Sequence, residues 1–209
     1  ADSQQRTNAA LRHNFTIRNP FADSGYWHTW WQKQDSTQET VMDGTLQRAG
    51  NAATQRYRKS EYAMTDSGIE AQFNKTIDGR VRQNWVYGLT YSHKDVDMQR
   101  HTRDSVAGRA SSSHEKNAPD SVIDQFGVFA QNRLSFGGSG VSLIPGLRYD
   151  YYRLNAKPDT SFWHTVGSSY QVSNYREDHF SFRLGSLYDI SNNHTLYANY
   201  AEGFRAPAF

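Results

Sequence analysis

The sequence predicts an all-β protein, a transmembrane antiparallel β-barrel to which this chain contributes about eight strands. Three observations predict it. Apolar and polar residues alternate with period two in one segment after another. Aromatic residues make up 14% of a chain that is only 36% hydrophobic, and many stand near strand ends, as in the interface girdles of membrane barrels. The links between the segments alternate between short and long.

Each predicted strand has an apolar and a polar side. In the segment 139–152, Val141, Leu143 and Leu147 lie on one side, whereas Arg148 and Asp150 lie on the other. The segment 26–34 has aromatic residues at both parities, so its sides are left unassigned. The alternating segments are, in chain order, 11–18, 62–74, 81–94, 122–136, 139–152 and 179–190, followed by a last strand at 196–200.

The links have the asymmetry of an outer-membrane barrel, with short periplasmic turns and long extracellular loops. The short links, 19–25, 76–79, 137–140 and 191–193, are rich in turn-forming Gly, Asn, Asp and Pro. The long polar links, expected to be extracellular loops, lie near 37–57, 95–119 and 154–176. Residues 1–209 are therefore expected to form part of a single barrel domain.

Two other β architectures fit the pattern less well. A soluble sandwich would also alternate, but its apolar faces would be mostly Val, Ile and Leu rather than Tyr, Trp and Phe. A closed barrel of eight strands has a narrow interior that side chains fill. Arg12, Arg148, Glu70 and Asp150 share the inward parity, and they would need close pairing in such an interior.

Composition narrows the classes of function. The net charge of +2 is too small to indicate a nucleic-acid partner. Cysteine is absent, so neither disulfides nor thiolate metal sites can form. No apolar run is long enough for a transmembrane helix, and none of the eight histidines has the spacing of a zinc site.

Three stretches resemble the barrel of the TonB-dependent outer-membrane receptors, over about residues 122–209: "QFGVFAQNRLSF", "LIPGLRYDYYRL" and "FSFRLGSLYDISNNHTLYANYAEGFRAPAF". The ending "GFRAP" is similar to the FRAP box of the haem and haemoglobin receptor branch. The resemblance implies a barrel of about 22 strands around a plug domain, with the chain an internal slice in which no plug is recognisable. It also implies a monomer in the bacterial outer membrane that contacts lipid and is energised by TonB through the plug.

The resemblance implies ligand binding by Phe204, Arg205, Ala206 and Pro207, which match the box. The Arg205 guanidinium would hold a haem propionate or a loop carboxylate; anchoring of the loop base to a neighbouring strand is the alternative. Imidazole binds iron, so His164, with aromatic neighbours in "SFWHTVGSSY", is the predicted loop contact to haem. For His164 the alternative is a solvated loop residue.

The function that follows is import of haem, free or taken from haemoglobin or other haem proteins, for iron acquisition. Haem is then the transported ligand, and no intrinsic cofactor, catalytic residue or protein metal site is expected. A ferric-siderophore or cobalamin receptor is the alternative, because related boxes stand at this position in those receptors. A barrel enzyme is a more distant alternative, since no nucleophile or acid and base pair has a recognisable spacing here.

Overall fold

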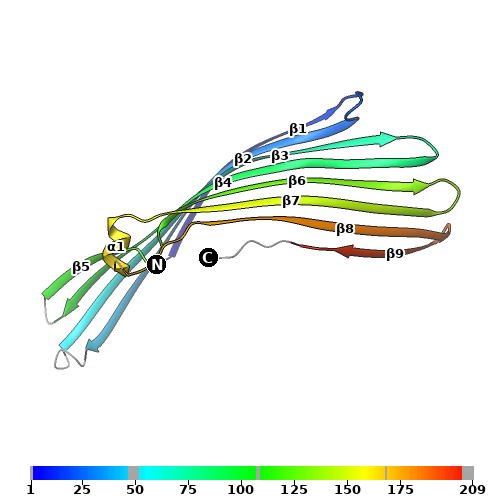
Figure 1. The fold of residues 1–209 in the computed structure, drawn as a ribbon. Helices are drawn as coiled ribbons and strands as arrows, with labels where there is room; N and C mark the ends of the chain where they lie inside the picture. The colour runs from blue at the N-terminus through cyan, green and yellow to red at the C-terminus, as the bar shows by residue number, and fades with distance from the viewer. Residues whose placement is uncertain (1, 47–51, 107–108, 168, 204–209) are drawn as a thin grey trace.

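The computed structural model describes residues 2–46, 52–106, 109–167 and 169–203, which form one antiparallel sheet and one short helix (Figure 1). The elements are β1 Asp2–Thr16, β2 Ser24–Leu46, β3 Ala52–Ile77, β4 Val81–Val106, β5 Arg109–Glu115, β6 Asp120–Phe136, β7 Val141–Lys157, α1 Thr160–Val166, β8 Tyr175–Ser191 and β9 His194–Ala201. Hydrogen bonds link β1-β2-β3-β4-β6-β7-β8-β9 in that order, and β5 pairs with the end of β4. The prediction of an all-β chain built from consecutive hairpins is confirmed.

The sheet is a single layer, so the chain has little core of its own. Within the described residues, the buried apolar side chains are Ala22, Val122, Tyr152, Leu154 and Phe162. A sandwich would instead bury one whole face of each sheet against the other. No helix in this part of the chain is long and apolar enough to cross a membrane.

The strand register divides the sheet into an apolar and a polar face, as the alternation predicts. One row runs from Leu89 through Val128 and Tyr149 to Phe180, and this side of the sheet is called the apolar face. The other side, with Arg148 and Asp150, is called the polar face. The register also assigns the segment 26–34. Odd-numbered residues such as Trp27, which pairs with Ala71, lie on the apolar face, and even-numbered ones such as Trp30 lie on the polar face.

All the short links lie at one end of the sheet, here called the turn end, and the long connections lie at the other, here called the hairpin end (Figure 1). At the turn end the Asn19 side chain accepts hydrogen bonds from the backbone N–H groups of Phe21 and Ala22, at 2.9 and 2.8 Å. In the turn 137–140, Gly138 and Gly140 have φ of 76° and 67°, a conformation that favours glycine. The predicted turn residues therefore form turns.

The hairpin end differs from the prediction. Residues 37–57 and 95–119, expected to be long loops, are largely strand: β2 and β3 continue to Leu46 and from Ala52, β4 continues to Val106, and β5 folds back on it. Most side chains on both faces of these extensions are polar, with Val96 and Met98 among the exceptions, so period two in hydropathy does not reveal them. Cross-strand polar contacts hold them instead, for example Arg56 Nη2 to Asp104 Oδ2 at 2.7 Å. The segment 154–176 does contain a long connection, which carries α1.

Candidate ligand-binding wall

The polar face presents aligned charged and hydrogen-bonding side chains at mid-height. Pairing across seven strands brings into one row Arg12, His28, Glu70, Thr90, Gly127, Asp150 and His179. Tyr26, in the neighbouring row, donates its hydroxyl to Glu70, and the Arg12 guanidinium lies 3.7 Å from the centroid of the Tyr26 ring. Such a face suits a wide, solvated interior rather than lipid.

Arg148 and Asp150 form a bidentate ion pair beside Gly127 of the neighbouring strand, where the absence of a side chain leaves room for it. Arg148 Nε lies 2.7 Å from Asp150 Oδ2, and its Nη2 lies 2.7 Å from Oδ1. A Cβ atom at Gly127 would stand 2.6 Å from Arg148 Nη2. The two charges satisfy each other.

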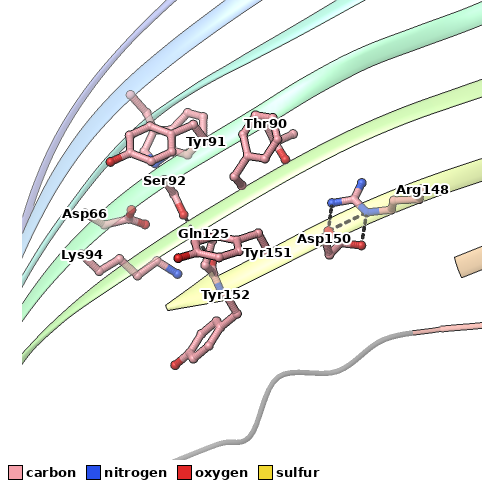
Figure 2. A pocket seen from close by; sticks show the side chains of 12 residues that line it. Asp66, Thr90, Tyr91, Ser92, Lys94, Gln125, Arg148, Asp150, Tyr151 and Tyr152 are labelled. Carbon is pink, nitrogen blue, oxygen red and sulfur yellow. Dashed lines mark hydrogen bonds and ion pairs between the residues drawn. The ribbon is translucent and has the colours of Figure 1, made fainter. Parts of the chain in front are cut away.

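A polar hollow of about 470 Å³ lies beside this pair, toward the hairpin end. Its lining includes Asp66, Lys94, Gln125 and Tyr152, and Figure 2 shows these side chains on neighbouring strands, with the Tyr152 ring directed away from the other three. Asp66 and Lys94 are directly paired in the β3–β4 register, yet no ion pair joins them. The Oδ1 atom of Asp66 is shielded from solvent and has no hydrogen-bond partner within the described residues.

An apolar hollow of about 500 Å³ adjoins the polar one, and Lys94 lines both. Tyr62 pairs with Met98 and Met64 with Val96, so these four side chains stand in adjacent rows of the polar face. The whole lining is Tyr62, Met64, Lys94, Val96, Met98, Ala118, Pro119, Ser121, Ile123, Leu154, Ala156, Tyr170, Gln171, Val172 and Ser173. The sequence prediction missed this hollow. Apolar residues at the inward parity were the available signal.

The connection after β7 covers part of this hollow. Phe162 of α1 is fully buried, and its ring centroid lies 5.9 Å from that of Tyr170, which lines the hollow. Asp159 caps the helix by accepting from the Phe162 N–H at 2.8 Å. α1 thereby positions the segment 169–173 against the strand wall.

Lys116, between β5 and β6, anchors α1. Its Nζ lies 2.7 Å from Asp120 Oδ2, 2.9 Å from Asp159 Oδ2 and 3.8 Å from Asp97 Oδ2, and its side chain is only 6% exposed. Burial lowers the pKa of Lys116, but the hydrogen bonds to Asp120 and Asp159 outweigh burial and raise that pKa overall. The hydrogen bond from Lys116, followed by that from the Phe162 N–H, lowers the pKa of Asp159. The anchor is therefore an ammonium among carboxylates at neutral pH.

Among the ligand residues predicted from the sequence, His164 is the one that lies in the part of the chain that the structure describes. Phe204, Arg205, Ala206 and Pro207 lie outside the described residues. His164 lies in the last turn of α1, where its side chain is exposed, and it lines neither hollow. Within the residues that the structure describes, no three His, Asp or Glu side chains are grouped so as to hold a metal ion.

Comparisons with known proteins agree with this architecture. The family model described as "TonB dependent receptor-like, beta-barrel" matches residues 1–209. A curated relative, the "Heme/hemopexin utilization protein C" of Haemophilus influenzae (strain 86-028NP), is 24% identical over 150 residues, which are 72% of this chain and 18% of that protein. The chain therefore spans about a fifth of this relative's length.

Three solved structures share the fold. They are BauA, the ferric preacinetobactin receptor from Acinetobacter baumannii (TM-score 0.60), the ferric-catecholate import receptor Fiu from E. coli K12 (0.61) and the ferric citrate transporter FecA (0.59). Each is 14% identical to the chain. They cover 95%, 96% and 95% of this chain, which spans 30%, 35% and 27% of theirs. At this identity the likeness shows the fold alone.

Proposed function

The chain belongs to the family of TonB-dependent receptor β-barrels, and on that premise we propose that it is part of the wall of an outer-membrane receptor that binds and imports haem. The haem would be free or taken from haemoglobin or another haem protein. The receptor would work as a monomer and draw energy from TonB through a plug domain. The family is one of transport receptors, so the ligand would pass through without covalent change.

The observation that carries the choice of haem is the match over 150 residues to a protein named for haem and hemopexin utilization. Two features support it. Residues 203–207 resemble the FRAP box of haem receptors, and the polar face combines an apolar hollow with an adjacent ammonium group, Lys94. Haem has an apolar ring and ionised propionates, and each of these has a complementary part in this wall.

The two faces of the sheet suggest how it sits in the membrane. Leu89, Val128, Phe180 and Phe182 are exposed on the apolar face, by 37% to 56%, and lipid would cover them. The polar face would line the interior. The turn end would lie in the periplasm and the hairpin end outside the cell, where the long hairpins and α1 could meet a haem protein.

Haem titration of the intact receptor, followed by absorbance, tests the proposal. We expect the Soret band to shift and sharpen as haem binds, and we expect Arg205→Ala to weaken the binding by about tenfold if its guanidinium holds a propionate. Arg18→Ala, at the turn end, is the matched control and should bind as the parent does. Absence of any Soret change with the parent receptor would contradict haem import.

A ferric-siderophore or cobalamin receptor would give that negative result. The same purified receptor would then quench its tryptophan fluorescence on addition of a ferric siderophore or of cobalamin. The titration therefore separates the two ligand classes within the receptor family.

A further inference from the structure

We propose that Lys94 and the apolar hollow form a subsite that holds the apolar body of a carboxylate-bearing ligand, with the carboxylate on the Lys94 ammonium. The inference rests on the proposed function and names the part of the described wall that would grip the ligand. It concerns β3, β4, β6 and β7 and the connection after α1, and its residues are other than those of the FRAP box.

The apolar side chains of this hollow lie on the face that is polar at mid-height. At mid-height the polar face carries Glu70, Thr90 and Asp150, whereas nearer the hairpin end it carries the pairs Tyr62–Met98 and Met64–Val96. Met98 is 41% exposed. An apolar surface on a solvated wall gains free energy when an apolar partner covers it.

The residue types suit a flat, unsaturated ligand. Methionine is flexible and polarizable and makes favourable contacts with aromatic rings. Tyr62 and Tyr170 add aromatic rings from two sides of the hollow, one from β3 and the other from the connection after α1. A porphyrin-like ring would thus lie between the strand wall and the segment 169–173.

Lys94 supplies the charge complement. Among the described residues that line the apolar hollow, it is the one charged side chain. It forms no ion pair in the part of the chain that the structure describes, although Asp66 stands directly opposite on β3. Asp66 lines the polar hollow and not the apolar one, so a carboxylate arriving from the apolar side meets the ammonium first.

The geometry places the cation close to the apolar wall. Lys94 and Met98 are four residues apart on the same face of β4, which corresponds to about 13 Å along the strand. On β6 the register partner of Lys94 is Ile123, whose own partner on β7 is Leu154, so apolar side chains continue the row on this side of the lysine, and Asp66 of β3 stands on its other side.

The test uses metal-free protoporphyrin IX and its dimethyl ester as fluorescent probes of the intact receptor, because neither needs an iron ligand. Lys94→Met should weaken protoporphyrin binding about tenfold and leave the ester, which has no carboxylates, unchanged. Met98→Asp should weaken both probes, since it places a charge in the apolar wall. Lys33→Met is the matched control: Lys33 lies on the other face and pairs with Asp35 at 3.3 Å, and its loss should change neither affinity.

The inference would be overturned if Lys94→Met bound each probe with the same affinity as the parent receptor does. It would also be overturned if the parent receptor bound neither probe. Far-UV circular dichroism and the thermal midpoint establish that each variant is folded, and Met98→Gln replaces Met98→Asp if the latter unfolds. Porphyrin binding that persists without a Soret response to haem would contradict haem ligation while supporting the subsite. A Soret response that Lys94→Met leaves unaltered, with both probe affinities unaltered too, would overturn the subsite while leaving haem import standing.

Discussion

At the scale of the residue, Gly127 matters because of what occupies the space beside it. A Cβ atom at this position would lie 2.6 Å from Arg148 Nη2, 2.9 Å from Thr90 Oγ1 and 3.0 Å from Asp150 Oδ1. All three atoms are ends of side chains, so Gly127→Ala would displace the ion pair and leave the backbone in place. We expect a loss of about 1 kcal/mol in the free energy of unfolding, measured by denaturant titration of the receptor in detergent.

Gly146→Ala is the control for this prediction. A Cβ atom at Gly146 would make ordinary contacts, the nearest at 3.6 Å, and removing a strand glycine stabilises through the unfolded chain where the conformation allows it. Gly146→Ala should therefore be neutral or slightly stabilising. An equal loss of stability in the two variants would show that the Arg148–Asp150 pair does not depend on the space at Gly127.

At the scale of the element, α1 depends on one lysine. The Lys116 ammonium joins Asp159, the carboxylate that caps α1, to Asp120 of β6. The backbone N–H of Lys116 also donates to Thr165 Oγ1, at 3.0 Å. Lys116→Met would leave the carboxylates facing one another without their cation. We expect amide hydrogen exchange over α1 to increase at least tenfold, with no change in β6. Lys75→Met, which removes a 2.8 Å ion pair to Asp23 at the turn end, should leave α1 unaffected. Unaltered exchange in Lys116→Met would contradict the anchoring role.

The same anchor gives α1 a dependence on pH. The pKa of Asp159 is lowered from its ordinary 3.8, chiefly by the Lys116 hydrogen bond. The stability that the ionised Asp159 gives to α1 is therefore present above pH 3.8 and is lost as the pH falls through the lowered value. Burial and then the charge of Asp120 raise the pKa of Asp97. Protonation of Asp97 therefore removes a destabilising buried charge, and this offsets part of the stability lost at Asp159. Exchange over α1 should therefore stay slow at neutral pH and accelerate below about pH 3.8. Acceleration near pH 6 instead would point to a histidine rather than to this cluster.

Strands with one apolar and one polar face could be predicted from the sequence, and strands whose two faces are both mostly polar could not. The alternation at 139–152 placed Leu147 and Arg148 on the correct sides of β7, and Gly, Asn and Asp marked the turns. The extensions at 37–57 and 95–119 were mistaken for loops because most side chains on both of their faces are polar, and hydrogen bonding to a neighbouring strand leaves no trace in hydropathy. The apolar hollow arises from residues on four strands and two connections, so it becomes visible only when the register is known.

At the scale of the whole molecule, the sheet depends on surroundings that cover its apolar face. Few of its described apolar side chains are buried within the chain, so its own packing supplies little of the free energy that ordering the backbone requires. In the family's barrel, lipid would cover the apolar face and the remaining strands would continue the sheet. The chain therefore behaves as part of a larger fold, and stability experiments belong with the intact receptor.

A matched pair of substitutions tests which face meets lipid. Ala130 and Gln131 are neighbours on β6, and their register partners are Leu147 on the apolar face and Gly146 on the polar face. An arginine on the lipid face costs about 2–4 kcal/mol at the bilayer midplane, whereas an arginine facing a solvated interior keeps its hydration. We expect Ala130→Arg to lower the unfolding free energy of the receptor in lipid vesicles by about that amount, and Gln131→Arg to change it by less than about 1 kcal/mol. The opposite order would mean that the polar face meets the membrane, and it would reverse both the assignment of the interior and the place of the ligand.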